Sequence, residues 1–265
     1  MVLTLNTVVD VAKKAGGVLK ENFGDRAAAK VIGRGSSGDI TRVADKLAED
    51  IIIAEVQRIG DSEIMSEEVG TLRFGPPRYR WIVDPLDGST NFARSIPFFA
   101  ISILVQEYDT RTAMFGVVCE PMTGRCFYAE TGKGAAMDGQ PIQTNKRRRL
   151  QDCIFYLDMH FAGETAKYQK FEKHVRRLGE TVKTFRSLGS CAIALAYTAL
   201  GTLDGFLDLS SNSRFVDVAG GLLVLTEAGG HAMDLEGRPL GEDYGGLLAC
   251  SSREIAEQVR ALVKV

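Results

Sequence analysis

The stretch WIVDPLDGSTNFARSIPFF, residues 81–99, constrains this chain more than any other. Its apolar start, residues 81–83, is typical of the end of a buried strand. The strand leads into a loop that carries two carboxylates, Asp84 and Asp87. Carboxylates three residues apart at a strand end are hard oxygen ligands for a cation such as Mg²⁺. The stretch therefore predicts a metal site.

The same loop has the composition of an anion-binding turn. Gly88 allows the backbone to come close to a ligand, and the N–H groups of Gly88, Ser89 and Thr90 can bind a phosphate as backbone nests do. A cation and a phosphate in one loop predict phosphoryl chemistry. The string Asp-Pro-Leu-Asp-Gly is also ordinary turn chemistry, and taken alone it favours a simple turn.

The chain has 265 residues, enough for one large domain or two intimately packed ones. Its 45% hydrophobic and 25% charged residues are ordinary for a globular protein, and a net charge of −2 gives no drive toward nucleic acid or an acidic membrane. No apolar run approaches the ~20 residues that span a bilayer, and the N-terminal segment lacks the blocks of a secretory signal. We therefore expect a cytoplasmic protein that binds neither nucleic acid nor membrane.

Five cysteines are scattered without a C-x-x-C pair, so a zinc cluster is not expected. Cys119 and Cys126 flank a predicted turn at residues 121–124 and can face each other across a hairpin. Reduced, buried thiols are the expected state of cysteines in a cytoplasmic chain.

Periodicity and turn signals divide the chain into approximate halves, 1–150 and 151–265, of one unit. The polar, Gly-rich segment 24–39 is interpreted as a mobile loop. In the first half we expect two helices, a short strand and an antiparallel meander, at 4–23, 41–59, 63–65, 100–105, 113–119 and 125–129. In the second half strands and helices alternate, which predicts a layered α/β region. Its strands are expected at 153–157, 182–185, 205–209 and around Ala232 and Leu248, and its helices at 165–177, 190–200, 216–228 and 253–262.

Three strings carry a resemblance to a known family. DPLDGSTNFARSIPFF resembles the first signature of the inositol monophosphatase superfamily. Upstream, Ser66-Glu67-Glu68 is similar to the family's paired-glutamate element, and VDVAGGLLVLTEAGG, residues 216–230, is similar to its second signature. The strings lie in the family's order. The resemblance implies an αβαβα sandwich of the inositol monophosphatase/fructose-1,6-bisphosphatase type and a phosphoric monoester hydrolase, closest to the dual branch that has both activities.

The resemblance also implies a metal site and a water-based mechanism. Two or three Mg²⁺ ions, replaceable by Mn²⁺, would be held by Glu67, Asp84, Asp87, Asp217 and the carbonyl of Leu86. Metal-activated water would attack the phosphate, with Glu67 and Ser89 orienting and deprotonating it and Asp45 supporting Ser89. Most members carry Thr where Ser89 stands, and Ser keeps the hydroxyl. From the residues alone, Asp45 and Asp217 are also N-terminal helix acids that favour the helix dipole.

The residues that would contact the substrate are Asp87, Gly88, Ser89, Thr90, Arg186, Cys191, Ser210 and Arg214. Ser210 stands near the place where inositol phosphatases often carry a Glu that binds inositol, and Asp208 is an alternative for that role. The guanidinium of Arg186 can bind a second phosphate, although a surface ion pair would explain it equally simply.

We therefore expect hydrolysis of inositol-1-phosphate, fructose-1,6-bisphosphate or both. A phosphatase for 3′-phosphoadenosine nucleotides is an alternative, but it needs an adenine pocket that the sequence does not reveal. A catalytically idle relative that serves as a binding protein is another, and the intact acidic set argues against it. The family commonly forms homodimers, so the resemblance implies one, with the apolar stretch 97–104 as a contributor.

Overall fold

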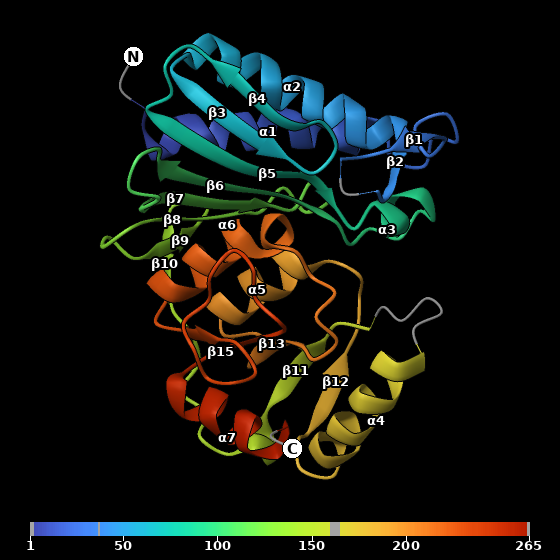
Figure 1. Ribbon diagram of the computed structural model, residues 1–265, viewed down its shortest axis with the longest axis vertical. Helices are drawn as coiled ribbons and strands as arrows, with labels where there is room; N and C mark the ends of the chain where they lie inside the picture. The colour runs from blue at the N-terminus through green and yellow to red at the C-terminus, as the bar shows by residue number, and fades with distance from the viewer. Residues whose placement is uncertain (1–2, 37, 160–164, 264–265) are drawn as a thin grey trace.

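The computed structural model describes residues 3–36, 38–159 and 165–263, which form five stacked layers (Figure 1). Helices α1 (Leu5–Glu21) and α2 (Val43–Ile59) cover the outer face of an eight-stranded sheet. Helices α5 (Cys191–Ala199) and α6 (Phe215–Glu227) lie between this sheet and a five-stranded sheet, and α4 (Thr165–Gly179) and α7 (Arg253–Val263) form the last layer. Hydrophobic clusters fill the spaces between the layers. The expected αβαβα sandwich is confirmed.

The eight-stranded sheet has the order β10-β9-β8-β7-β6-β5-β3-β4. Its strands are β3 (Ser62–Ser66), β4 (Gly70–Phe74), β5 (Tyr79–Asp87), β6 (Ala100–Glu107), β7 (Ala113–Cys119), β8 (Cys126–Glu130), β9 (Ala135–Met137) and β10 (Gln140–Ile142). All neighbours pair antiparallel except β3 and β5, which are parallel. All nine residues of β5 are buried because helices pack on both faces of the sheet, α2 on one and α6 on the other. The predicted meander of β6, β7 and β8 is confirmed.

The five-stranded sheet has the order β12-β11-β13-β15-β14. Its strands are β11 (Ile154–Leu157), β12 (Thr184–Arg186), β13 (Gly205–Asp208), β14 (His231–Met233) and β15 (Leu247–Cys250), preceded by the 3₁₀ turn η1 (Leu150–Asp152). Because β11 runs parallel to both β12 and β13, the carboxyl ends of these three strands meet at one edge. That edge is where an open α/β sheet generally binds its ligands.

Two glycines bring α6 against the eight-stranded sheet. A Cβ atom at Gly220 would lie 2.8 Å from the carbonyl oxygen of Ile103, and one at Gly116 would lie 2.7 Å from the carbonyl oxygen of Gly220. Side chains do not fit at such separations, so the backbones of helix and sheet meet directly. The close packing of α6 on the eight-stranded sheet therefore requires glycine at both positions.

The interpretation of residues 24–39 as a loop is wrong for its second part. β1 (Val31–Arg34) pairs antiparallel with β2 (Ile40–Arg42) as a small hairpin that leads into α2. Val31, Ile32 and Ile40 are all exposed, so the hairpin has no alternation of buried and exposed residues that a sequence pattern would reveal. Three other strands that sequence reasoning did not predict, β4, β9 and β10, are likewise short or at an edge.

Cys119 and Cys126 lie directly opposite each other in β7 and β8, as the hairpin prediction allowed. Their Cα atoms are 4.2 Å apart, and the structure joins them as a disulfide. The expectation of reduced thiols is wrong for this pair, because the strand register forces the two side chains together. Cys153, Cys191 and Cys250 are free thiols.

Within the described residues, no helix has the length and apolarity needed to cross a lipid bilayer.

Candidate active site

A β-bulge at the end of β5 presents two carboxylates together. Asp84 pairs with Ser102 of β6 and Asp87 with Ala100, so β5 carries one extra residue between these pairs. Residues three apart in a regular strand face opposite sides of the sheet, and the extra residue brings both side chains to one side. Pro85 lies in the bulge, where its missing N–H costs no sheet hydrogen bond.

Carboxylate oxygens of Glu67, Asp84 and Asp217 all lie within 4.8 Å of one another. Asp84 comes from β5, Glu67 follows β3, and Asp217 lies in the first turn of α6. Burial, followed by the charge of Glu67, raises the pKa of Asp84 well above its usual range. Burial also raises the pKa of Asp217 to about 6, although the nearby Arg214 opposes this shift. Buried hard oxygens with like charges fit a divalent cation, which would compensate the repulsion.

Asp87 lies at the N-terminus of α5. Its carboxylate accepts hydrogen bonds from Ser190 Oγ at 2.5 Å, from the N–H of Ala192 at 2.7 Å and from the N–H of Cys191 at 3.2 Å. Burial raises the pKa of Asp87 to about 7, against the effect of these hydrogen bonds. Asp87 thus connects the loop after β5 to the start of α5. Its carboxylate is not one of the three, from Glu67, Asp84 and Asp217, that lie within 4.8 Å of one another.

Glu68 and Asp45 form an acidic region behind Glu67. The hydroxyl of Thr41 donates to Glu68, and burial raises the pKa of Glu68 to about 7. Asp45 accepts from the N–H of Arg42 at 2.6 Å and thereby caps α2, and burial raises its pKa to about 8. Among the described residues Asp45 makes no hydrogen bond to Ser89, so its observed role is that of a helix-capping acid.

Arg214 connects α6 to the large sheet. Its Nη2 contacts Glu67 Oε1 and lies 3.3 Å from Asp217 Oδ1, while its Nη1 lies 3.0 Å from Asp39 Oδ2. Its backbone N–H also donates to Asp217 at 2.8 Å. Although burial acts against the charged form, Asp217 and Glu67 raise the pKa of Arg214.

The predicted phosphate loop surrounds the start of α3 (Ser89–Ala93). Gly88 has φ 98°, and a Cβ there would lie 3.0 Å from the carbonyl oxygen of Gly189, so only glycine fits. The backbone N–H groups of Ser89 and Thr90 belong to the first helical turn and have no partner within the helix. Such amides at a helix start can bind an anion.

Arg186 ends β12 at the edge where the parallel strands finish. Its Nη1 donates to Thr184 Oγ1 at 3.1 Å and to the carbonyl oxygen of Phe185 at 2.8 Å. The exposed guanidinium therefore turns back onto its own strand.

Cys191 and Ser210 lie at the same edge. Burial, followed by the charges of Asp87 and Asp158, raises the pKa of the Cys191 thiol well above its usual range. The buried Ser210 donates through its Oγ to Asp208 at 3.1 Å.

Asp208 is fully buried and holds the loop that follows β13. Its carboxylate accepts the N–H and hydroxyl groups of both Ser210 and Ser213, at 2.7–3.1 Å. In this structure the oxygens of Asp208 bind groups of its own loop, and its alternative role with inositol hydroxyls stays a prediction.

Sequence reasoning missed four residues of this region, namely Ser190, Asp158, Asp39 and Tyr244. Ser190 could have been found as an N-cap, because a serine before an apolar helix is a start signal and the capping bond to Ile193 is present. Asp158 follows β11 at the ligand-binding edge, and burial raises its pKa to about 6. Asp39 and Tyr244 reach the site from distant loops, and no local pattern marks them.

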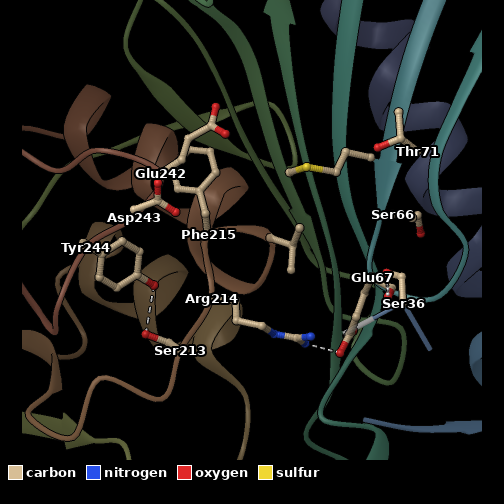
Figure 2. A pocket seen from close by; sticks show the side chains of 13 residues that line it. Ser36, Ser66, Glu67, Thr71, Ser213, Arg214, Phe215, Glu242, Asp243 and Tyr244 are labelled. Atoms are coloured by element: carbon tan, nitrogen blue, oxygen red, sulfur yellow. Dashed lines mark hydrogen bonds and ion pairs between the residues drawn. The ribbon is translucent and has the colours of Figure 1, made fainter. Parts of the chain in front are cut away.

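A cavity of about 530 Å³ opens beside Glu67 and Arg214. Figure 2 shows Arg214 extending from the α6 side toward Glu67 at the large sheet, with Glu242, Asp243 and Tyr244 on the α6 side, away from Glu67. The hydroxyl groups of Tyr244 and Ser213 lie 2.9 Å apart on this side.

The chain matches the inositol monophosphatase family over residues 3–264. It is 36% identical over 261 residues to an inositol-1-monophosphatase of Mesorhizobium japonicum, covering 98% of this chain and 94% of that protein. It is 35% identical over 237 residues to a fructose-1,6-bisphosphatase/inositol-1-monophosphatase of Thermococcus kodakarensis, covering 89% of this chain and 84% of that protein. The solved structure of extragenic suppressor protein suhB from Bartonella henselae has a TM-score of 0.89 at 31% identity, covering 98% of this chain and 97% of that one. The chain therefore belongs to the inositol monophosphatase family and is a phosphoric monoester hydrolase.

Proposed function

We propose that this enzyme is a Mg²⁺-dependent phosphomonoesterase that hydrolyses inositol-1-phosphate and the 1-phosphate of fructose-1,6-bisphosphate. The observation that carries the proposal is the group of three carboxylates, Glu67, Asp84 and Asp217, together with the helix-start amides of Ser89 and Thr90, which follow Asp84 and Asp87 in the same loop. Hard anionic oxygens and free amides are complementary to a cation and a phosphate, respectively.

The cations would be held by these three carboxylates, by Asp87 and by the carbonyl oxygen of Leu86. When bound, divalent cations at such a site supply charge that binds the phosphate and lowers the pKa of water. Two or three Mg²⁺ ions, or Mn²⁺ ions in their place, are compatible with the number of acidic groups.

The chain's own groups would position the substrate and the water. The amides of Ser89 and Thr90 hold the phosphate oxygens, and Gly88 provides the close approach. Glu67 and Ser89 orient a water molecule and accept its proton as its oxygen attacks phosphorus. The bond from phosphorus to the sugar oxygen breaks, and that oxygen leaves with a proton from solvent. Asp45 supports this region by capping the N-terminus of α2, where it accepts a hydrogen bond from the N–H of Arg42.

The substrate's sugar or cyclitol part would lie at the edge formed by β11, β12 and β13. Cys191, Ser210 and Arg186 are the candidate contacts there, and Arg214, which lines the cavity beside Glu67, is the fourth candidate. Relatives of both names, inositol-1-monophosphatase and the dual enzyme, support a phosphorylated cyclitol or sugar. The guanidinium of Arg186 could leave Thr184 and bind a second phosphate, which only the bisphosphate has.

A phosphate-release screen in Mg²⁺ tests the proposal, with inositol-1-phosphate, fructose-1,6-bisphosphate and 3′-phosphoadenosine phosphate as substrates. We expect turnover of the first two. Turnover of the nucleotide alone would refute the proposal and indicate a phosphatase for 3′-phosphoadenosine nucleotides. Absence of turnover on all three substrates would favour a catalytically idle binding protein.

The role of Arg186 is tested by Arg186→Ala in the same screen. Loss of a charge-assisted contact of ~1.5–3 kcal/mol would raise KM for the bisphosphate roughly 10–150-fold. KM for inositol-1-phosphate should change little. Arg238→Ala should change neither KM, because Arg238 pairs with Asp234 and Glu236 and lines no part of the cavity at the site. An equal effect on both substrates would mean that Arg186 does not discriminate between them.

We also propose a homodimer that acts in the cytoplasm. A largely apolar pocket of about 320 Å³ between α6 and the sheet, lined by Leu104, Ala113, Phe215 and Leu223 among others, supports a contact surface there. The expectation that the apolar stretch 97–104 contributes to the contact is wrong, because residues 99–104 are buried in the core and in the central strand β6. Sedimentation at micromolar concentration should give twice the chain mass, and a monomer mass would refute the dimer.

A further inference from the structure

Arg214 occupies the position of a counter-ion in the acidic group. Its guanidinium contacts Glu67 Oε1 and lies 3.3 Å from Asp217 Oδ1. These residues supply two of the three carboxylates that lie within 4.8 Å of one another. Among the ion pairs of the described residues, Arg214 provides the cation for both.

The contacts of Arg214 are those that a metal ion would need. A divalent cation bound by Glu67 and Asp217 takes carboxylate oxygens of the same two residues, and two cations cannot share them at close range without repulsion. The guanidinium and the metal are therefore competitors for one set of oxygens.

The cavity beside Arg214 can accommodate its side chain in a second position. The Arg214 side chain is 34% exposed, and it lines the cavity of about 530 Å³ beside the acidic group. Asp243 and the hydroxyl groups of Ser213 and Tyr244 lie on the α6 side of this cavity (Figure 2). The guanidinium can thus leave the carboxylates without leaving polar surroundings.

We propose that Arg214 is a resident counter-ion that a divalent cation must displace from Glu67 and Asp217 when it enters the site. This inference rests on the proposed metal dependence and adds to it a competition within the chain. Arg214 stabilises the metal-free fold and sets the metal affinity lower than the carboxylates alone would give.

The test is calorimetric titration of Mg²⁺ into protein freed of metal with EDTA and dialysed, with no substrate present. Arg214→Gln removes the competitor and should bind Mg²⁺ at least about tenfold more tightly than wild type. Arg214→Lys keeps the positive charge but lacks the planar fork that reaches two carboxylates, so it should also bind more tightly. Arg238→Gln is the matched control, because Arg238 also pairs with two carboxylates, Asp234 and Glu236, neither of which belongs to the acidic group. Its affinity should equal that of wild type.

Melting temperatures provide a second measurement. In EDTA, Arg214→Gln should melt below wild type because Glu67 and Asp217 lose their counter-ion, and saturating Mg²⁺ should close this gap. Equal or weaker Mg²⁺ binding by Arg214→Gln overturns the inference. So does an Arg214→Lys variant with wild-type affinity, because charge alone would then explain the effect. A wild type that binds no Mg²⁺ would instead refute the proposed function.

Discussion

Asp84 is 2% exposed and lies beside Glu67 and Asp217, so its charge works against the metal-free fold. Asp84→Asn removes one negative charge from the group while keeping the size of the side chain. We expect it to lower kcat by roughly 10²-fold or more, on the scale of losing a preorganised electrostatic contact. In EDTA the variant should melt at or above the temperature of wild type, because repulsion is relieved. Lower stability together with lost activity would mean that Asp84 acts chiefly through packing.

Ser89 is the residue whose hydroxyl is proposed to orient the water. Ser89→Ala should reduce kcat by roughly 10²-fold, the usual scale for losing an acid–base element. Ser89→Thr keeps the hydroxyl and should retain most activity. Similar, mild losses in the two variants would leave Ser89 with only a role in starting α3.

At the scale of the element, α6 carries Asp217 and meets the sheet through Gly220. Gly220→Ala places a methyl group 2.8 Å from the carbonyl oxygen of Ile103, so the helix must shift. We expect weaker Mg²⁺ binding, measured by calorimetry, together with a lower melting temperature. Gly17→Ala in α1 is the control, since no atom lies within 4 Å of its new methyl group. Alanine favours a helix there and should be neutral or stabilising. Unchanged Mg²⁺ affinity in Gly220→Ala would show that the helix position is not critical.

The helices and central strands could be predicted from the sequence because their apolar periodicity is strong. The α1 helix presents Val8, Ala12, Ala15 and Leu19 to the core at the expected spacing. The β1–β2 hairpin could not be predicted in this way, because its apolar residues are exposed and backbone hydrogen bonds define it. The acids of the site were accessible through turn chemistry and through the family resemblance. The pairings of these acids were not, because Ser190 and Arg214 reach Asp87 and Glu67 from distant parts of the chain.

At the scale of the whole molecule, the buried acids make stability depend on pH. The pKa of Asp45 is about 8 in the folded protein against 3.8 for an ordinary aspartate. The unfolded chain loses this proton near 3.8 and the folded protein keeps it to about 8, so the free energy of unfolding falls as pH rises through this interval. Urea unfolding of metal-free protein at several pH values should show this fall. The slope should be smaller in Asp45→Asn and unchanged in Asp50→Asn, whose carboxylate is exposed on the same helix. If the free energy of unfolding falls with pH as steeply in Asp45→Asn as in wild type, Asp45 is not the group responsible.

The acidic group joins parts of the chain that lie far apart in the sequence, since Glu67 follows β3, Asp84 lies in β5 and Asp217 lies in α6. The group therefore exists only when α6 is docked on the large sheet, and this docking must overcome the repulsion among the charges of the group. A cation that binds only the docked state should favour docking during refolding. Refolding in Mg²⁺ should yield more docked protein than refolding in EDTA, with the difference lost in Asp84→Asn. The cation would thus serve as a cofolding ligand as well as a catalyst, and its supply would influence how much of the newly made chain matures.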